Sequence, residues 1–129
     1  MTTDEKTSQG GPRRVGPALE KAYQFVLWLI PTVEKFPRSQ KFLLGDRLQS
    51  TALDMLEGLI EATYTREASP VLRRVNLLLE RLRVLARLAK DLALLDLRRY
   101  EFAERAVDEI GRRVGGWLKA GRGTAGEGH

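Results

Sequence analysis

The sequence has no cysteine, and its single histidine, His129, is the last residue. The lack of cysteine excludes disulfides, thiolate zinc sites and cysteine nucleophiles. A histidine at a chain end has no neighbour to orient it, so histidine catalysis and histidine metal sites are not expected. The composition therefore argues against an enzyme and predicts neither a cofactor nor a metal.

Long apolar runs are missing as well. No stretch of about 18 uncharged apolar residues occurs, and the N-terminal residues are polar where a signal peptide needs an apolar segment. These features predict a soluble, cytoplasmic protein. The net charge of +5 suggests an anionic partner, but such a balance is also common in proteins that bind none.

What the sequence does contain is typical of one globular domain. The chain has 129 residues, of which 43% are hydrophobic and 30% charged. Glycine-rich polar ends predict flexible tails over 1–16 and 122–129, on either side of a folded part over 17–121. No segment alternates like a strand, so the prediction is all-α, an antiparallel up-down four-helix bundle.

Apolar residues at steps of three and four predict helices over about 17–36, 37–65, 70–95 and 97–121. Pro31 should kink the first helix, whereas Phe36 and Pro37 make the corner before the second. Ser69 and Asp96 are predicted to cap the third and fourth helices. The third helix has the clearest apolar seam, formed by Val71, Val75, Leu78, Leu82, Leu85, Ala89 and Leu92.

Glycines and charge pairs mark the helix surfaces. Gly45 in the second helix is expected to let another helix approach closely. The same is expected of three glycines in the fourth helix, Gly111, Gly115 and Gly116. The outer surface of the fourth helix is expected to carry three solubilising pairs at a spacing of four residues, Glu101 with Arg105, Asp108 with Arg112, and Glu109 with Arg113.

The third helix holds most of the excess positive charge, because its six basic and two acidic residues sum to +4. Helical geometry places Arg73, Arg83, Arg87 and Lys90 in one basic stripe, with Arg74 and Arg81 at its flank. Such a stripe neutralises phosphates, and binding would weaken steeply with salt. Two alternatives stay open: a merely solvated face, or a surface that pairs between subunits with the acidic face of the second helix, which carries Asp46, Asp54, Glu57 and Glu61.

Two segments together resemble a known family. They are "FPRSQKFLLGDRLQSTALDMLEGLIEATY" and, much later, "DEIGRRVGGWLK". The Phe-Pro start, the Leu-Gly that follows it and the spacing of glycines before a tryptophan resemble the Avd family. Avd is the accessory variability determinant of diversity-generating retroelements, and it is related to the four-helix bundle proteins of ribosomal-RNA intervening sequences. The resemblance covers roughly residues 18 to 120.

The resemblance implies a non-enzymatic accessory protein that assembles into homopentameric barrels. Such a protein binds the reverse transcriptase of its retroelement and RNA or DNA, and it supports mutagenic cDNA synthesis and retrohoming. In this sequence the family's binding arginines fall on Arg83 and Arg87 within "LRVLAR". Arg73, Arg74, Arg81 and Lys90 are added by helical geometry alone. The alternative is an oligomeric scaffold of the intervening-sequence type that has no reverse transcriptase partner.

Overall fold

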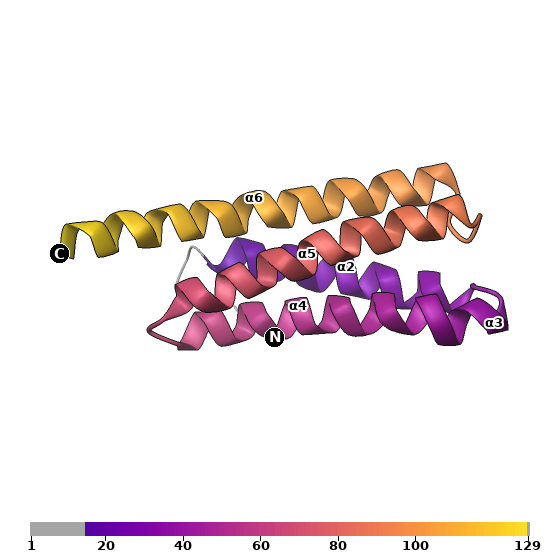
Figure 1. Ribbon diagram of the computed structural model, residues 1–129, viewed down its shortest axis with the longest axis horizontal. Helices are drawn as coiled ribbons and strands as arrows, with labels where there is room; N and C mark the ends of the chain where they lie inside the picture. Colours follow the sequence, from indigo (N-terminus) through magenta and orange to yellow (C-terminus); the bar gives the residue numbers. More distant parts are fainter. Residues whose placement is uncertain (1–14, 129) are drawn as a thin grey trace, which may run out of the picture.

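The computed structural model describes residues 15–128, with side chains for 16–121. Its regular structure is entirely helical in this range and consists of α2 (Val15–Glu34), α3 (Arg38–Gln40), the π-helical segment η1 (Lys41–Gly45), α4 (Asp46–Tyr64), α5 (Ala68–Asp91) and α6 (Leu97–Gly128). The long helices α2, α4, α5 and α6 lie side by side and are joined by short connections (Figure 1). The predictions of an all-α fold and a four-helix bundle are confirmed.

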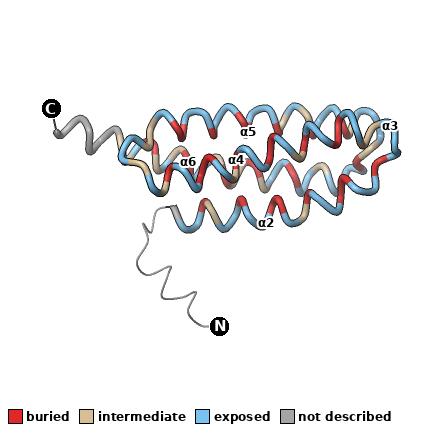
Figure 2. The backbone as a smooth tube through the Cα atoms, turned by 90° about the horizontal axis from the view of Figure 1, so that it is seen from below, coloured by how far each residue is buried: buried red, intermediate tan, exposed pale blue. Residues whose placement is uncertain are grey.

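The helices pack in a ring in which α4 contacts α5, α5 contacts α6, and α2 contacts both α4 and α6. Buried residues recur along the inward side of each helix (Figure 2). This periodicity of three to four residues is what the apolar seams predicted. The largest fully buried side chains come from α4, α5 and α6 and from the end of α2: Leu48, Met55, Leu59, Leu72, Leu79, Leu82, Ile110, Val33, Val75, Val107 and Val114.

The corner between α2 and α4 contains two short helical segments, α3 and η1. Phe36 is buried there, and Pro37 precedes α3, as the Phe-Pro signal indicated. The π-helical segment was not predicted, and it turns both Leu44 and Gly45 into the interior. A Cβ atom on Gly45 would lie 2.7 Å from Val33 Cγ1. The close neighbour of Gly45 is thus the end of α2 in the same chain.

The predicted ends of the third helix were wrong. α5 begins at Ala68, and no side chain caps it, so Ser69 lies inside the first turn. Pro70 is tolerated in that turn because the first amides of a helix have no partner within the helix. At the other end Ala93 adopts a left-handed φ of 63°, and its amide and that of Leu94 donate to carbonyls of the last turn. The helix therefore stops at Asp91, before Leu92, which is 51% exposed.

The remaining helix ends agree in part with expectation. Asp96 caps α6, since its Oδ1 accepts a hydrogen bond from the Arg99 amide at 2.8 Å. α6 runs on to Gly128, past the predicted end near Gly121. α2 begins at Val15 and continues through Pro31 to Glu34, two residues before Phe36. The predicted tail over 1–16 lies almost wholly outside the described residues.

Contacts between side chains of different helices fix how the helices sit along one another. The rings of Trp28 on α2 and Phe102 on α6 lie 4.6 Å apart between centroids. Lys21 Nζ also reaches Glu109 Oε2 across the same pair of helices, at 3.1 Å.

In the range that the structure describes, no helix is both apolar and long enough to span a membrane.

Candidate functional site

The hollow that the structure describes in the core of the bundle is too small for a substrate. This hollow, lined by Phe25 and Leu82 among others, has a volume of about 10 Å³, which holds about one water molecule. Nowhere in the described range do three His, Asp or Glu side chains gather closely enough to hold a metal ion. The candidate functional residues are therefore those on the outside of the helices.

α5 points its six predicted cations in three directions. Successive residues of an α-helix are rotated by about 100°, so neighbours in the sequence face different partners. Arg74 and Arg81 face α4, Arg83 and Lys90 face α6, and Arg73 and Arg87 face outward. The six do not form one continuous stripe.

Arg83 is engaged inside the chain. Its Nη2 lies 2.6 Å and its Nε 3.1 Å from Asp108 Oδ1 on α6, and its Nη1 lies 2.9 Å from Glu80 Oε1. The hydrogen bond to Asp108 is the main reason that the pKa of Arg83 is raised. A Cβ on Gly111 would lie 3.7 Å from Arg83 Nη2, an ordinary van der Waals contact, so Arg83 does not require a glycine there. The charge of Arg83 is thus already matched by two carboxylates.

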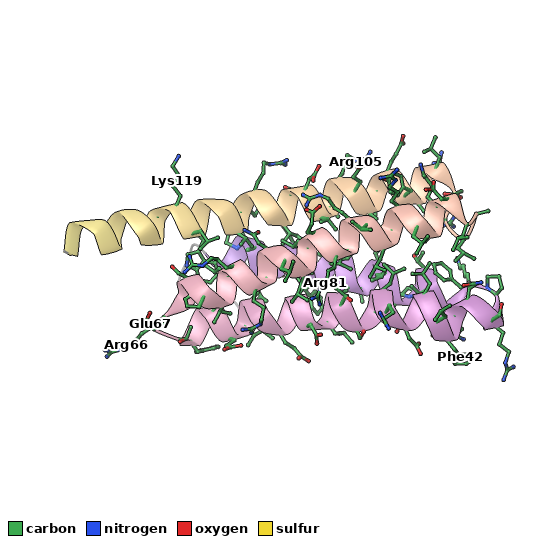
Figure 3. The ribbon with its side chains drawn as sticks, viewed as in Figure 1. Phe42, Arg66, Glu67, Arg81, Arg105 and Lys119 are labelled. Carbon is green, nitrogen blue, oxygen red and sulfur yellow. The ribbon has the colours of Figure 1, made fainter. Side chains whose placement is uncertain are left out.

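The cations on the α4 side meet the acidic face of α4. Arg74 Nη2 lies 2.8 Å from Glu61 Oε1. Arg81 lies over the groove between α4 and α5, which Asp54 also lines (Figure 3). At Arg74 and Glu61 the flank of the basic stripe and the acidic face of α4 therefore meet within one chain, while pairing of the two faces between subunits stays an alternative.

Lys90 sits at the end of α5 beside α6. Its Nζ is 4.9 Å from the centroid of the Tyr100 ring and 3.5 Å from Asp91 Oδ1. A cation held over an aromatic face and beside a carboxylate has most of its charge satisfied locally.

The outward side of α5 mixes cations with apolar residues. Arg73 makes no ion pair with any described side chain, and Arg87 Nε is 3.9 Å from Asp91 Oδ2 with 73% of its side chain exposed. Leu77 and Val84 lie between them in the sequence and Leu88 directly follows Arg87, and these three residues are 53%, 59% and 45% exposed. We call Arg73, Leu77, Val84, Arg87 and Leu88 the α5 outer face. Exposed apolar residues rimmed by charge are typical of a protein contact.

Sequence reasoning missed the free cations of α6. Of the three predicted pairs only Glu109 with Arg113 forms, at 3.4 Å. Asp108 bonds Arg83 instead of Arg112, and Glu101 makes no ion pair with Arg105. The outward cations Arg98, Arg105, Arg112 and Lys119 make no ion pair in the described part of the chain. Their regular spacing of seven residues was the available signal.

A second exposed apolar surface lies where α2 meets α4. Tyr23, Leu27 and Ile30 share one side of α2 and are 52%, 55% and 37% exposed. On α4, Leu53 and Ile60 are 38% and 43% exposed. We call these five residues the α2–α4 apolar face. Several large apolar side chains exposed together are unusual on a monomer and mark contact surfaces.

The fold defines an all-α four-helix bundle, and the candidate functional side chains in its described part lie on the outside of the helices. The chain belongs to the bAvd-like family, because the family model matches residues 18–121. The resemblance to Avd proteins is confirmed, and the further kinship with intervening-sequence proteins stays a prediction. No curated protein matches the chain significantly.

Proposed function

We propose that this chain is a non-catalytic accessory protein of a diversity-generating retroelement, acting in the cytoplasm. It binds the reverse transcriptase of that element together with RNA or DNA, and in this way supports mutagenic cDNA synthesis and retrohoming. The observation that carries the proposal is the bAvd-like family match over 18–121, which spans nearly the whole bundle. The filled core and the exposed cations are consistent with a role in binding.

Among the six cations of α5, the proposal assigns the contact mainly to Arg73 and Arg87. Both point outward, whereas Arg74 and Arg83 are held by carboxylates of α4 and α6. Arg81 and Lys90 lie at the borders and contribute less. The exposed Leu77, Val84 and Leu88 supply apolar area for a protein partner, which points to the polymerase as the ligand of the α5 outer face.

We further propose that copies of the chain assemble as a homo-oligomer, a pentameric barrel of antiparallel up-down bundles. The α2–α4 apolar face supports self-association, because a stable assembly must cover such a surface. Stoichiometry is measured by light scattering on the purified full chain.

The test of the proposed function is co-purification of the chain with the reverse transcriptase of its proposed retroelement. The double variant Arg73→Ala/Arg87→Ala removes the outward cations without breaking any ion pair shorter than 3.9 Å. The matched control, Arg38→Ala/Arg66→Ala, also removes two exposed arginines, from sites off α5. We expect the first to reduce polymerase recovery at least about tenfold and the control to leave it within about twofold. Equal recovery for both variants at unchanged particle mass would contradict the assignment.

The alternative function is an oligomeric scaffold of the intervening-sequence type without a polymerase partner. The α2–α4 apolar face favours it equally, since self-association alone would cover that surface. A chain that forms a stable oligomer but recovers no polymerase, even in the unsubstituted form, would support the scaffold over the accessory protein.

A further inference from the structure

The outward side of α6 carries a straight row of cations. Arg98, Arg105, Arg112 and Lys119 follow one another at intervals of seven residues and are all exposed. At 1.5 Å per residue, neighbours lie about 10 Å apart along the axis, and the row extends about 31 Å. A straight helix drifts only about 20° per seven residues, so the four remain on one side. We call these four residues the α6 ridge. Figure 3 shows Arg105 and Lys119 extending away from the bundle.

The acids of α6 do not neutralise this row. Asp108 bonds Arg83 of α5, and Glu109 bonds Lys21 of α2 and Arg113. Asp108 thus pairs with a cation of α5, and Glu109 pairs with a cation of α2 and one of α6 that is outside the ridge. Glu104 lies on the side of α6 that faces α5, where it borders the core hollow with Arg83.

Among the described side chains of α6, Glu101 is the acid that shares the exposed side of the ridge. It lies between Arg98 and Arg105 in the sequence and makes no ion pair with a described side chain. Four cations and one carboxylate leave the ridge with a net charge of +3, because 4 − 1 = 3. The surface is therefore strongly positive.

The chemistry of the ridge favours a polyanion over a protein or a membrane. The exposed large apolar residues of α6 are Leu97 and Phe102, and neither belongs to the ridge. Phe102 is covered on one side by Trp28. Protein contacts are anchored by buried aromatic or aliphatic side chains, and a helix that lies on a membrane needs an apolar face. A row of cations whose exposed aromatic neighbour, Phe102, is already packed against Trp28 has instead the features of a phosphate contact.

We propose that the α6 ridge binds the phosphate backbone of single-stranded nucleic acid. A single strand is flexible, so its phosphates can adjust to cations about 10 Å apart, whereas the phosphates of a duplex are held on a winding backbone. The inference deepens the proposed function and rests on its nucleic-acid part only. The ridge carries the nucleic acid, and the α5 outer face is left for the polymerase, so the two ligands occupy separate surfaces.

The test measures binding of a short fluorescein-labelled single-stranded RNA by anisotropy across a salt series. The ridge variant Arg105→Gln/Arg112→Gln removes two unpaired cations. The matched control Arg99→Gln/Arg113→Gln removes the same charge from the same helix, but at cations already bound to Asp96 and Glu109. Particle mass and helical content of every variant are measured in the same buffers.

We expect the ridge variant to bind roughly tenfold more weakly at moderate salt, and its log–log salt slope to shrink by about 1.4, or 0.7 per lost phosphate contact. The control should lose less than about threefold. Polymerase recovery by the ridge variant should be unchanged. That pattern supports the ridge as the nucleic-acid site.

Three results would overturn the inference. Equal losses in the ridge variant and the control mean that only net charge matters. A lower particle mass in the ridge variant means that the ridge is a subunit contact. Ridge-dependent binding to phosphatidylserine vesicles, with RNA binding unaffected, means that the ligand is a membrane surface.

The same experiment separates the inference from the proposed function. If the unsubstituted chain recovers polymerase but binds no RNA at low salt, the ridge inference is wrong and the accessory role stands. If RNA binding depends on Arg73 and Arg87 rather than on the ridge, the inference also fails, and the nucleic-acid contact returns to α5.

Discussion

α5 and α6 differ in how many of their cations are free of ion pairs within the described part of the chain. α5 has the larger excess, six basic against two acidic residues, but it gives Arg74 to α4 and Arg83 to α6, and it separates Arg73 from Arg87 with exposed leucine and valine. α6 is closer to neutral in sequence. Its outward cations are nevertheless unpaired within the described residues, because Asp108 and Glu109 are engaged with other helices.

The comparison shows that the net charge of a helix does not locate a binding surface. A carboxylate can pair with a cation on its own helix or with one on a neighbouring helix, and packing decides which. Asp108 is the clearest case, because its contact with Arg83 both removes a cation from the α5 surface and frees Arg112 on α6. This one ion pair makes the surface of α5 less positive and that of α6 more positive.

The largest expected effect on stability follows from the close packing of α4 against α5, which α6 lacks at Gly116. A Cβ on Gly58 would lie 2.7 Å from Val75 Cγ2, whereas a Cβ on Gly116 meets no described atom within 4 Å. We expect Gly58→Ala to destabilise the fold by about 1–3 kcal/mol through overpacking between α4 and α5. Gly116→Ala should stabilise α6 by about 0.5–1 kcal/mol, since alanine is the better helix former. Urea unfolding measures both.

If Gly116→Ala instead destabilised the fold, another surface, such as a second copy of the chain, would have to pack against that position. The close approach predicted for Gly115 and Gly116 would then occur between subunits, as it does not occur among the described residues of one chain.

A smaller effect is expected from removing single cations. Arg83→Gln should destabilise the bundle by about 1 kcal/mol, because it leaves Asp108 without its partner at a site that is only partly exposed. Arg112→Gln on the ridge should change stability by less than about 0.5 kcal/mol. A double-mutant cycle of Arg83 with Asp108, followed by urea unfolding, measures the coupling. Equal effects of the two single substitutions would remove the distinction between engaged and free cations.

The smallest expected effect is a dependence of stability on acid. The amide of Arg99 lowers the pKa of Asp96 below 3.8, and the hydrogen bond from Lys21 lowers that of Glu109 below 4.5. Because both are lowered on folding, their stabilisation is present above those ordinary values and is lost as pH falls through the lowered ones. Thermal unfolding between about pH 5 and pH 2 should therefore show a weaker decline for Asp96→Asn/Glu109→Gln than for the unsubstituted chain. Identical declines would show that other carboxylates govern acid stability.

Much of the fold was predictable because it follows from local pattern. The apolar steps of three and four indicated the four helices, Phe36 and Pro37 indicated the first corner, and Asp96 indicated the last cap. The errors arose at helix ends and corners, where the apolar periodicity does not decide the backbone conformation. The π-helical segment, which ends at Gly45, brings that glycine close to Val33. The left-handed conformation of Ala93 ends α5 at Asp91, before Leu92, the last residue of the predicted apolar seam.

The role of the six cations of α5 as a binding site stays a prediction, and the sequence did not indicate how they are distributed over the surface. Helical geometry placed Arg83 and Arg87 on nearly the same side of one helix, and the structure separates them because Asp108 stands opposite Arg83. The ridge of α6 was present in the sequence as a spacing of seven residues. It was obscured because Glu101 and Asp108, each four residues before a ridge arginine, were expected to pair with Arg105 and Arg112.

The sequence by itself determined that this chain is an all-helical, cysteine-free bundle with an excess of positive charge and the motifs of the bAvd-like family. These properties depend on residue type and on periodicity along the chain, which are local. Only the tertiary structure decided which cations are free. An ion pair forms across about 3 Å, and whether Asp108 lies that close to Arg83 or to Arg112 depends on how α5 and α6 are placed against each other.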